Sequence, residues 1–197
     1  MDRRHLILAP LALLPLAACE RMASKPQFKA VDITGADYAQ GFDLPDANVQ
    51  RRTLADFKGQ VVVVFFGFTH CPDVCPTTLL ELAAVKKRLG ADGEKVQGVF
   101  ITVDPERDTP PLLKAYVENF GAGFVALRGT PEETRALAKA FKVFYAKVPG
   151  KTEDSYTMDH TAASYVFDTQ GRVRLFTRYG SGAEALAADL KLLLAGA

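Results

Sequence analysis

The stretch VVVVFFGFTHCPDVCP, residues 61–76, decides the fold. Its first six residues are valines and phenylalanines, which predict a strand buried on both faces. Pro76 lacks a backbone N–H and is tolerated in a helix only within the first turn. The stretch therefore predicts a buried strand, a short connection that carries Cys71, and a helix. The first turn of that helix contains Cys75, and its N-cap lies near Asp73.

The two cysteines are the chemically informative part of this stretch. Both sulfurs should lie near the positive end of the helix dipole, which favours thiolate over thiol. The carboxyl ends of strands in open α/β sheets are also where functional sites lie, and the motif falls there. Two thiolates in one turn can form a disulfide or bind a soft metal ion, and the spacing of Cys71 and Cys75 does not decide between these. Inert packing as small buried hydrophobes is the third interpretation.

Apolar periodicity and capping signals extend the prediction outward from this stretch. The polar segment 145–160 contains Pro149-Gly150 and is predicted to be a long loop. The order β-α-β, α, β-β-α predicts a thioredoxin-like α/β sandwich, with a central mixed sheet flanked by helices and a short N-terminal β-hairpin. The predicted strands are a hairpin over residues 42–53, single strands at 61–66, 96–103 and 124–127, and a hairpin of residues 162–167 and 173–176. The first predicted helix runs to Leu89 with Gly90 as its C-cap, and the second runs from Thr109 and Pro110 to Phe120. The third runs from the capping box at Thr130 to about Phe144, and the last begins at a capping box over residues 181–184.

A third ligand would favour metal over a disulfide, and the chain has 3 histidines. His5 belongs to the leader described below, and the side chain of His70 is expected to point away because it adjoins Cys71. His160 ends the predicted loop, at a junction that packs against the first-helix cysteines in a thioredoxin-like fold. Two sulfurs and one imidazole nitrogen suit Cu(I) and can also hold Cu(II). The alternative for His160 is a surface histidine in a loop.

Three stretches resemble the Sco/SenC family of copper-binding proteins, which assist assembly of cytochrome c oxidase. They are CPDVCP at 71–76, VDPERDTP at 103–110 and DHT at 159–161, and the resemblance covers about residues 40–195. It implies one copper ion bound by Cys71, Cys75 and His160 and delivered to the dinuclear copper centre of oxidase subunit II. Further partners would be a copper donor and a thiol reductant in the cell envelope. Some relatives instead reduce the cysteines of the oxidase centre.

Asp104 ends the second predicted strand and should face the same rim as the cysteines. It is expected either to accept a hydrogen bond close to the metal ligands and tune them, or to cap a turn. Four aromatic residues are predicted to belong to the core: Tyr116, Phe120, Phe141 and Phe144.

The leading function is thus a metallochaperone, which is a binding protein rather than an enzyme. The alternative is a thiol-disulfide oxidoreductase that uses Cys71 and Cys75 and does not require His160. A peroxidase is less favoured. The segment FTHCP at 68–72 is loosely similar to the peroxiredoxin active site, but Phe65 stands where that family has proline.

Residues 1–18 are predicted to be a signal peptide. The apolar run at 6–16 follows two arginines and is too short to span a bilayer core of about 30 Å. The sequence LAAC at 16–19 resembles the bacterial lipobox, so Cys19 is predicted to carry lipid; simple cleavage that leaves a free Cys19 is the alternative. Residues 19–38 are predicted to be a tether and 39–197 the copper-binding domain. The expected location is the periplasmic face of the bacterial cytoplasmic membrane, with the outer membrane as the alternative.

Composition excludes several other classes. The chain has 24 basic and 23 acidic side chains, and this formal charge of +1 gives no electrostatic reason to expect nucleic acid as a partner. Apolar residues at 48% and charged residues at 24% are typical of a globular protein and exclude overall disorder. The 3 cysteines are too few for a disulfide scaffold.

Overall fold

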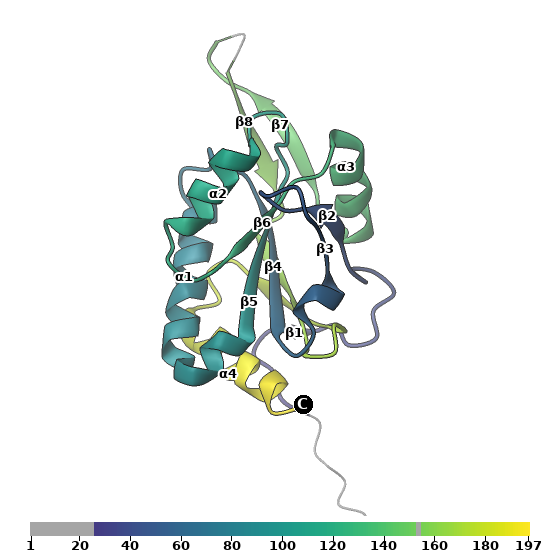
Figure 1. The fold of residues 1–197 in the computed structure, drawn as a ribbon, viewed down its shortest axis with the longest axis vertical. Coiled ribbons are helices and arrows are strands. Elements are labelled where there is room, and N and C mark those ends of the chain that lie inside the picture. Colours follow the sequence, from purple (N-terminus) through teal and green to yellow (C-terminus); the bar gives the residue numbers. More distant parts are fainter. Residues whose placement is uncertain (1–25, 153–154) are drawn as a thin grey trace, which may run out of the picture.

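The computed structural model describes residues 26–152 and 155–197, to which all structural statements refer. Its main element is a six-stranded mixed sheet with the strand order β1-β10-β9-β4-β5-β6 (Figure 1). The pairs β2–β3 and β7–β8 form two separate two-stranded sheets. The strands are β1 (Val31–Asp32), β2 (Asp43–Pro45), β3 (Arg51–Thr53), β4 (Val61–Gly67), β5 (Val96–Thr102), β6 (Val125–Leu127), β7 (Tyr145–Pro149), β8 (Tyr156–His160), β9 (Ala163–Phe167) and β10 (Val173–Arg178). The helices are α1 (Val74–Leu89), α2 (Pro110–Glu118), α3 (Pro131–Ala140) and α4 (Ala183–Leu194), with 3-10 helices η1 (Leu54–Phe57) and η2 (Gly90–Lys95).

Strand β4 forms the centre of the sheet, and all 7 of its residues are buried. It pairs in parallel with β5 and antiparallel with β9, so both of its edges are hydrogen-bonded. Successive side chains of a strand point to opposite faces. Phe65 accordingly lines a cavity together with residues of α1 and α4, whereas Phe66 packs on Phe141 beyond α3. The predicted doubly buried strand is confirmed.

Helices cover both faces of this sheet (Figure 1). Helices α1 and α4 pack against each other on one face. Helix α2 lies on the same face, because its Tyr116 contacts Phe100, which in turn contacts Phe65. Helix α3 and the β2–β3 hairpin lie on the other face, linked by an ion pair between Arg51 and Glu133. The mixed sheet flanked by helices and the N-terminal hairpin are as predicted.

The prediction of a long loop over residues 145–160 is wrong. Strands β7 and β8 pair antiparallel there, from Tyr145 opposite His160 to Pro149 opposite Tyr156. Met158 is the one fully buried residue of these two strands. A hairpin that buries so little apolar surface has only a weak alternation of apolar and polar residues, and its composition is therefore typical of a loop.

Helix α3 ends at Ala140, whereas the sequence predicts a helix to Phe144. Lys142 has a φ of 55°, a left-handed conformation that is incompatible with continued helix. Phe144 lies beyond this break and is 64% exposed, so its assignment to the core is wrong, while Phe141 is buried as predicted.

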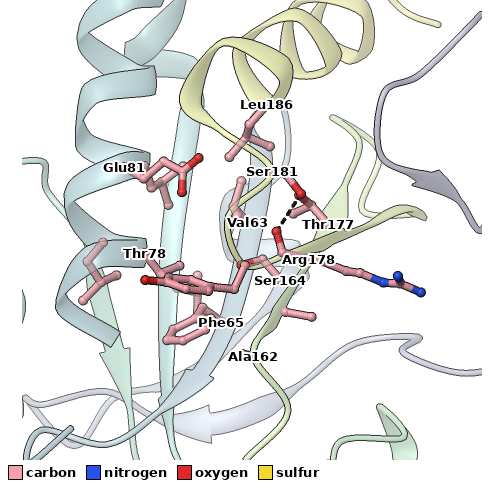
Figure 2. A pocket seen from close by; sticks show the side chains of 15 residues that line it. Val63, Phe65, Thr78, Glu81, Ala162, Ser164, Thr177, Arg178, Ser181 and Leu186 are labelled. Atoms are coloured by element: carbon pink, nitrogen blue, oxygen red, sulfur yellow. Dashed lines mark hydrogen bonds between the residues drawn. The ribbon is translucent and has the colours of Figure 1, made fainter. Parts of the chain in front are cut away.

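The two predicted capping boxes have different outcomes. At α3 the hydroxyl of Thr130 accepts a hydrogen bond from the Glu133 backbone N–H at 3.2 Å, and the box is complete. At α4 the N-cap is Gly182, and the hydroxyl of Ser181 donates instead to the carbonyl oxygen of Arg178 at 2.6 Å (Figure 2). The capping box predicted for α4 is therefore absent.

The first described residues are bound to the domain. Asp189 of α4 is 1% exposed, and its carboxylate accepts hydrogen bonds from the backbone N–H groups of Lys29 and Ala30, both at 2.8 Å. Strand β1 then pairs with β10. Part of the tether predicted over residues 19–38 is thus held against the body. The predicted signal peptide 1–18 and Cys19 lie outside the described residues.

None of the helices within the described residues is both long and apolar enough to span a bilayer.

Candidate metal centre

Cys71 and Cys75 lie at the carboxyl end of β4, where the chain turns into α1. The N-cap of α1 is Asp73, and Pro76 occupies the first turn, as the sequence predicts. Cys75 is fully buried, Cys71 is partly exposed, and both thiols are free. The backbone N–H of Cys75 donates to the Cys71 sulfur at 3.4 Å, which favours a negative charge on that sulfur.

Gly67, the last residue of β4, makes room for the buried cysteine. A Cβ atom at this position would lie 2.8 Å from Cys75 Sγ, 2.8 Å from the ring of Phe100 and 2.9 Å from the ring of Phe65. These distances are shorter than any real Cβ contact. A glycine inside a strand often marks such a close approach, so Gly67 is itself a signal of this site in the sequence.

His160, the last residue of β8, completes the cluster. Its Nε2 lies 3.5 Å from Cys75 Sγ, and the ligand atoms of Cys71, Cys75 and His160 all lie within 4.8 Å of one another. The other ring nitrogen, Nδ1, lies 3.1 Å from the carbonyl oxygen of Thr161. This contact assigns the proton to Nδ1, so that the lone pair of Nε2 faces the sulfurs.

The spacing of the cluster fits a single bound ion. Metal–sulfur bonds of about 2.3 Å and metal–nitrogen bonds of about 2.0 Å, as in zinc sites, keep the two kinds of ligand within about 4.3 Å of each other. The 3.5 Å between Cys75 Sγ and His160 Nε2 satisfies this limit. The three residues proposed from the sequence therefore meet in space, with donor atoms of the soft type that copper prefers.

Two phenylalanine rings form the walls around His160. The rings of Phe65 and Phe68 contact the imidazole edge-on, with centroid distances of 5.8 and 5.9 Å. Both phenylalanines are almost completely buried. The imidazole is thus held by apolar walls that limit its rotation.

The two thiols differ strongly in acidity. A hydrogen bond from the Cys75 thiol, assisted by the backbone N–H groups of Asp73 and Cys75, lowers the pKa of Cys71 to about 5, although partial burial opposes this shift. The same hydrogen bond, together with burial, raises the pKa of Cys75 far above its ordinary value. Near neutral pH the pair therefore consists of a Cys71 thiolate and a Cys75 thiol that donates to it.

Two residues singled out from the sequence have other contacts. The Nδ1 of His70 lies 3.0 Å from the hydroxyl of Thr69, and the half-exposed ring is outside the cluster, as expected. The carboxylate of Asp104 accepts hydrogen bonds from Arg107 and Tyr156. Among the described residues, neither of these bonds joins Asp104 to a cysteine or to His160, so any influence on the cluster is indirect.

Asp108 is a site residue that the sequence reasoning misses. It is fully buried, and its carboxylate accepts hydrogen bonds from the hydroxyl of Thr69 at 2.6 Å and from the hydroxyl of Thr102 at 2.5 Å. The Thr69 backbone N–H also donates to it, at 3.1 Å. Asp108 thereby fixes the chain two residues before Cys71. Its signals in the sequence are its place in the VDPERDTP stretch at 103–110 and its position directly before the N-cap Thr109.

A small cavity lies behind Phe65, between the sheet and helices α1 and α4 (Figure 2). Val63, Thr78 and Leu186 contribute to its wall, and its volume is about 30 Å³. A water molecule needs about 10–15 Å³ of such space, so the cavity has room for at most a few water molecules. The cavity is therefore too small to compete with the cysteine–histidine cluster as a functional site.

Comparison with known proteins agrees with this geometry. The SCO1/SenC family profile matches residues 31–195. The structure of Bradyrhizobium japonicum ScoI with copper bound is 43% identical, covers 78% of this chain and 97% of that chain, and has a TM-score of 0.70. The apo Sco1 protein from Thermus thermophilus is 36% identical, covers 86% and 99% of the two chains, and has a TM-score of 0.75. These matches confirm the predicted thioredoxin-like fold.

Among curated proteins, the mitochondrial SCO2 homolog of Bos taurus is 37% identical over 169 residues, which are 84% of this chain and 62% of that protein. The SCO2-like protein of Rickettsia felis is 38% identical over 132 residues, 66% of this chain and 64% of that protein. The chain thus spans less than two thirds of the length of these relatives. Because the family profile covers nearly all of the described domain, this chain belongs to the SCO1/SenC family.

Proposed function

We propose that this protein is a copper metallochaperone. In this proposal Cys71, Cys75 and His160 bind one copper ion, which the protein delivers to the dinuclear copper centre of cytochrome c oxidase, in subunit II. The observation that carries the proposal is the clustering of the three ligand atoms within 4.8 Å, although His160 is far from the cysteines in the sequence. Support comes from the copper-bound Bradyrhizobium relative and from the description of the Sco family as cytochrome c oxidase assembly proteins.

The two thiols have different tasks in copper binding. The Cys71 thiolate is ready to accept the ion, whereas Cys75 must first lose its proton, so binding releases protons. His160 offers a neutral nitrogen through Nε2. Two thiolates favour Cu(I), and the added imidazole allows Cu(II) to be held by the reduced pair.

Copper stoichiometry tests the proposal. Protein that lacks residues 1–18 and carries Cys19→Ser should bind one Cu(I) per chain. Cys71→Ser, Cys75→Ser and His160→Ala should each lose most of this copper. His70→Ala is the matched control, because His70 adjoins the site but its ring lies outside the cluster. Wild-type copper content in any of the three variants would remove that residue from the site.

The second candidate function is thiol-disulfide exchange that keeps the oxidase cysteines reduced. The different acidities of the thiols favour it, because Cys71 is an attacking thiolate and Cys75 a buried thiol. Cys71 would attack a target disulfide and form a mixed disulfide, and one target thiolate would leave. Cys75, after losing its proton, would then displace the second target thiolate, and an envelope thiol reductant would restore the dithiol. Such exchange should survive His160→Ala, whereas copper binding should not.

We further propose that a lipid on Cys19 attaches the protein to the periplasmic face of the cytoplasmic membrane. There it would receive copper from a donor in the envelope. The proposal rests on the lipobox-like LAAC at 16–19 and on the apolar run before it.

A further inference from the structure

The strand that carries His160 stands apart from the main sheet. Strands β7 and β8 pair only with each other and not with the six-stranded sheet. At the base of the hairpin, the Thr161 backbone N–H donates to the Phe144 carbonyl oxygen at 2.9 Å. The position of the rest of β8 relative to the body therefore depends on contacts outside the main sheet, made by the residues of the hairpin.

Tyr156, the first residue of β8, makes several such contacts. Its hydroxyl donates to the Asp104 carboxylate at 2.9 Å, and its carbonyl oxygen accepts from the Arg107 guanidinium at 2.8 Å. The same guanidinium lies over the Tyr156 ring, 3.7 Å from its centroid, and donates to Asp104 at 2.5 Å. Asp104 is 1% exposed. Ring, hydroxyl and backbone of Tyr156 are thus all held by one arginine–carboxylate pair.

The loop that supplies this pair also reaches the cysteine side of the cluster. Residues 104–108 connect β5 to α2, and the Asp108 backbone N–H donates to the Asp104 carbonyl oxygen at 3.0 Å. Asp108 holds the Thr69 hydroxyl and backbone N–H, two residues before Cys71. One short, internally hydrogen-bonded loop therefore contacts both segments that carry the metal ligands.

We propose that loop 104–108 is a brace that sets the position of His160 relative to the cysteines, with Arg107 and Tyr156 as positioning residues. Asp108 holds the Cys71 end of the brace, and the Arg107–Tyr156 contact holds the β8 end. Loosening the β8 end should let β8 move away from the body while the thiols remain in place. The expected change in copper affinity rests on the proposed copper binding. The expected change in the mobility of the β7–β8 hairpin does not.

Two mild substitutions test the brace in the full chain. Tyr156→Phe removes only the hydroxyl that donates to Asp104, and Arg107→Lys keeps the charge but removes the planar stack on the ring. Tyr38→Phe and Arg88→Lys are the matched controls, since these residues lie outside the brace. Amide hydrogen exchange of residues 157–160 in the metal-free protein reports the mobility of β8, and competition with a Cu(I) chelator reports affinity. Alkylation of Cys71 reports the state of the thiols.

The brace predicts faster exchange in β8 and about 10- to 100-fold weaker copper binding in both variants, with Cys71 alkylation and both controls unchanged. Unchanged exchange in Tyr156→Phe and Arg107→Lys would overturn the inference, as would faster exchange with unchanged copper affinity. If Arg107→Lys does not fold, Tyr156→Phe by itself tests the brace, because it deletes a single oxygen atom and should leave the fold intact. A wild-type chain that binds no copper would refute the proposed function, and the exchange data would then decide the brace by themselves.

Discussion

Replacing Gly67 by alanine is the sharpest test of how the buried cysteine is accommodated. The new Cβ would lie 2.8 Å from Cys75 Sγ, whereas ordinary contact begins at 3.4 Å, so the sulfur or the strand must move by about 3.4 − 2.8 = 0.6 Å. Overpacking of this kind costs about 1–3 kcal/mol of folding free energy. At about 2–4 °C per kcal/mol for a domain of this size, the melting temperature should fall by about 2–12 °C.

The displaced sulfur should also bind copper less well. A ligand shifted by a few tenths of an ångström loses its preferred geometry, and we expect about 10- to 100-fold weaker binding, comparable to the loss of a group that orients a ligand. Thermal unfolding of the metal-free protein and competition with a Cu(I) chelator measure the two effects separately.

Gly98→Ala is the matched control. Gly98 lies on the neighbouring strand β5, and a Cβ there would lie 2.5 Å from the Phe124 ring and 2.9 Å from Leu82, away from the cluster. It should lose similar stability but keep its copper affinity. Wild-type copper affinity in Gly67→Ala, or an equal loss of affinity in Gly98→Ala, would refute the reasoning that the space at Gly67 serves the metal ligand.

Four further predictions concern the thiols and the anchor. Alkylation of the reduced protein should follow the titration of Cys71, with a midpoint near pH 5 that rises toward the ordinary value of 9.0 in Cys75→Ala. Below pH 5 protonation of Cys71 should compete with copper and release it, and a midpoint near 9 in the unaltered protein would contradict the assigned hydrogen bond. The oxidised protein, with a Cys71–Cys75 disulfide, should take up far less copper than the reduced protein, and equal uptake would point to other ligands. Cys19→Ser should release the protein from isolated membranes, and retention in the membrane fraction would be evidence against the lipobox.

The local chemistry of the strand, turn and first helix is predictable because each signal acts within a few residues. The apolar run of β4 and the position of Pro76 are sufficient to place Cys71 and Cys75 at the start of α1. Antiparallel pairing of β9 with β4 then places the start of β9, and the His160 junction just before it, beside the carboxyl end of β4. The ligand set is therefore predictable from the sequence.

The surroundings of the cluster could not be predicted in this way, because they depend on contacts between distant segments. The β7–β8 hairpin buries too little apolar surface to produce a pattern, so it has the composition of a loop. The stack of Arg107 on Tyr156 joins residues 49 positions apart, and neither residue type indicates a partner. Asp104 lies at the predicted rim, but only the fold shows that its carboxylate faces this pair.

The attachment of residues 29 and 30 to α4 limits how far the domain can lie from a lipid on Cys19. Asp189 fixes residues 29 and 30 at the end of the domain opposite the β7–β8 hairpin (Figure 1). From Cys19 to Phe28 the chain takes 28 − 19 = 9 residue steps, a span of at most about 32 Å when fully extended. A lipid on Cys19 would then keep the α4 end of the domain within about 32 Å of the bilayer, and the copper-binding end lies on the far side of the domain from this attachment (Figure 1). A copper acceptor near the membrane surface would therefore be reached when the domain turns on its tether so that the copper-binding end faces the bilayer.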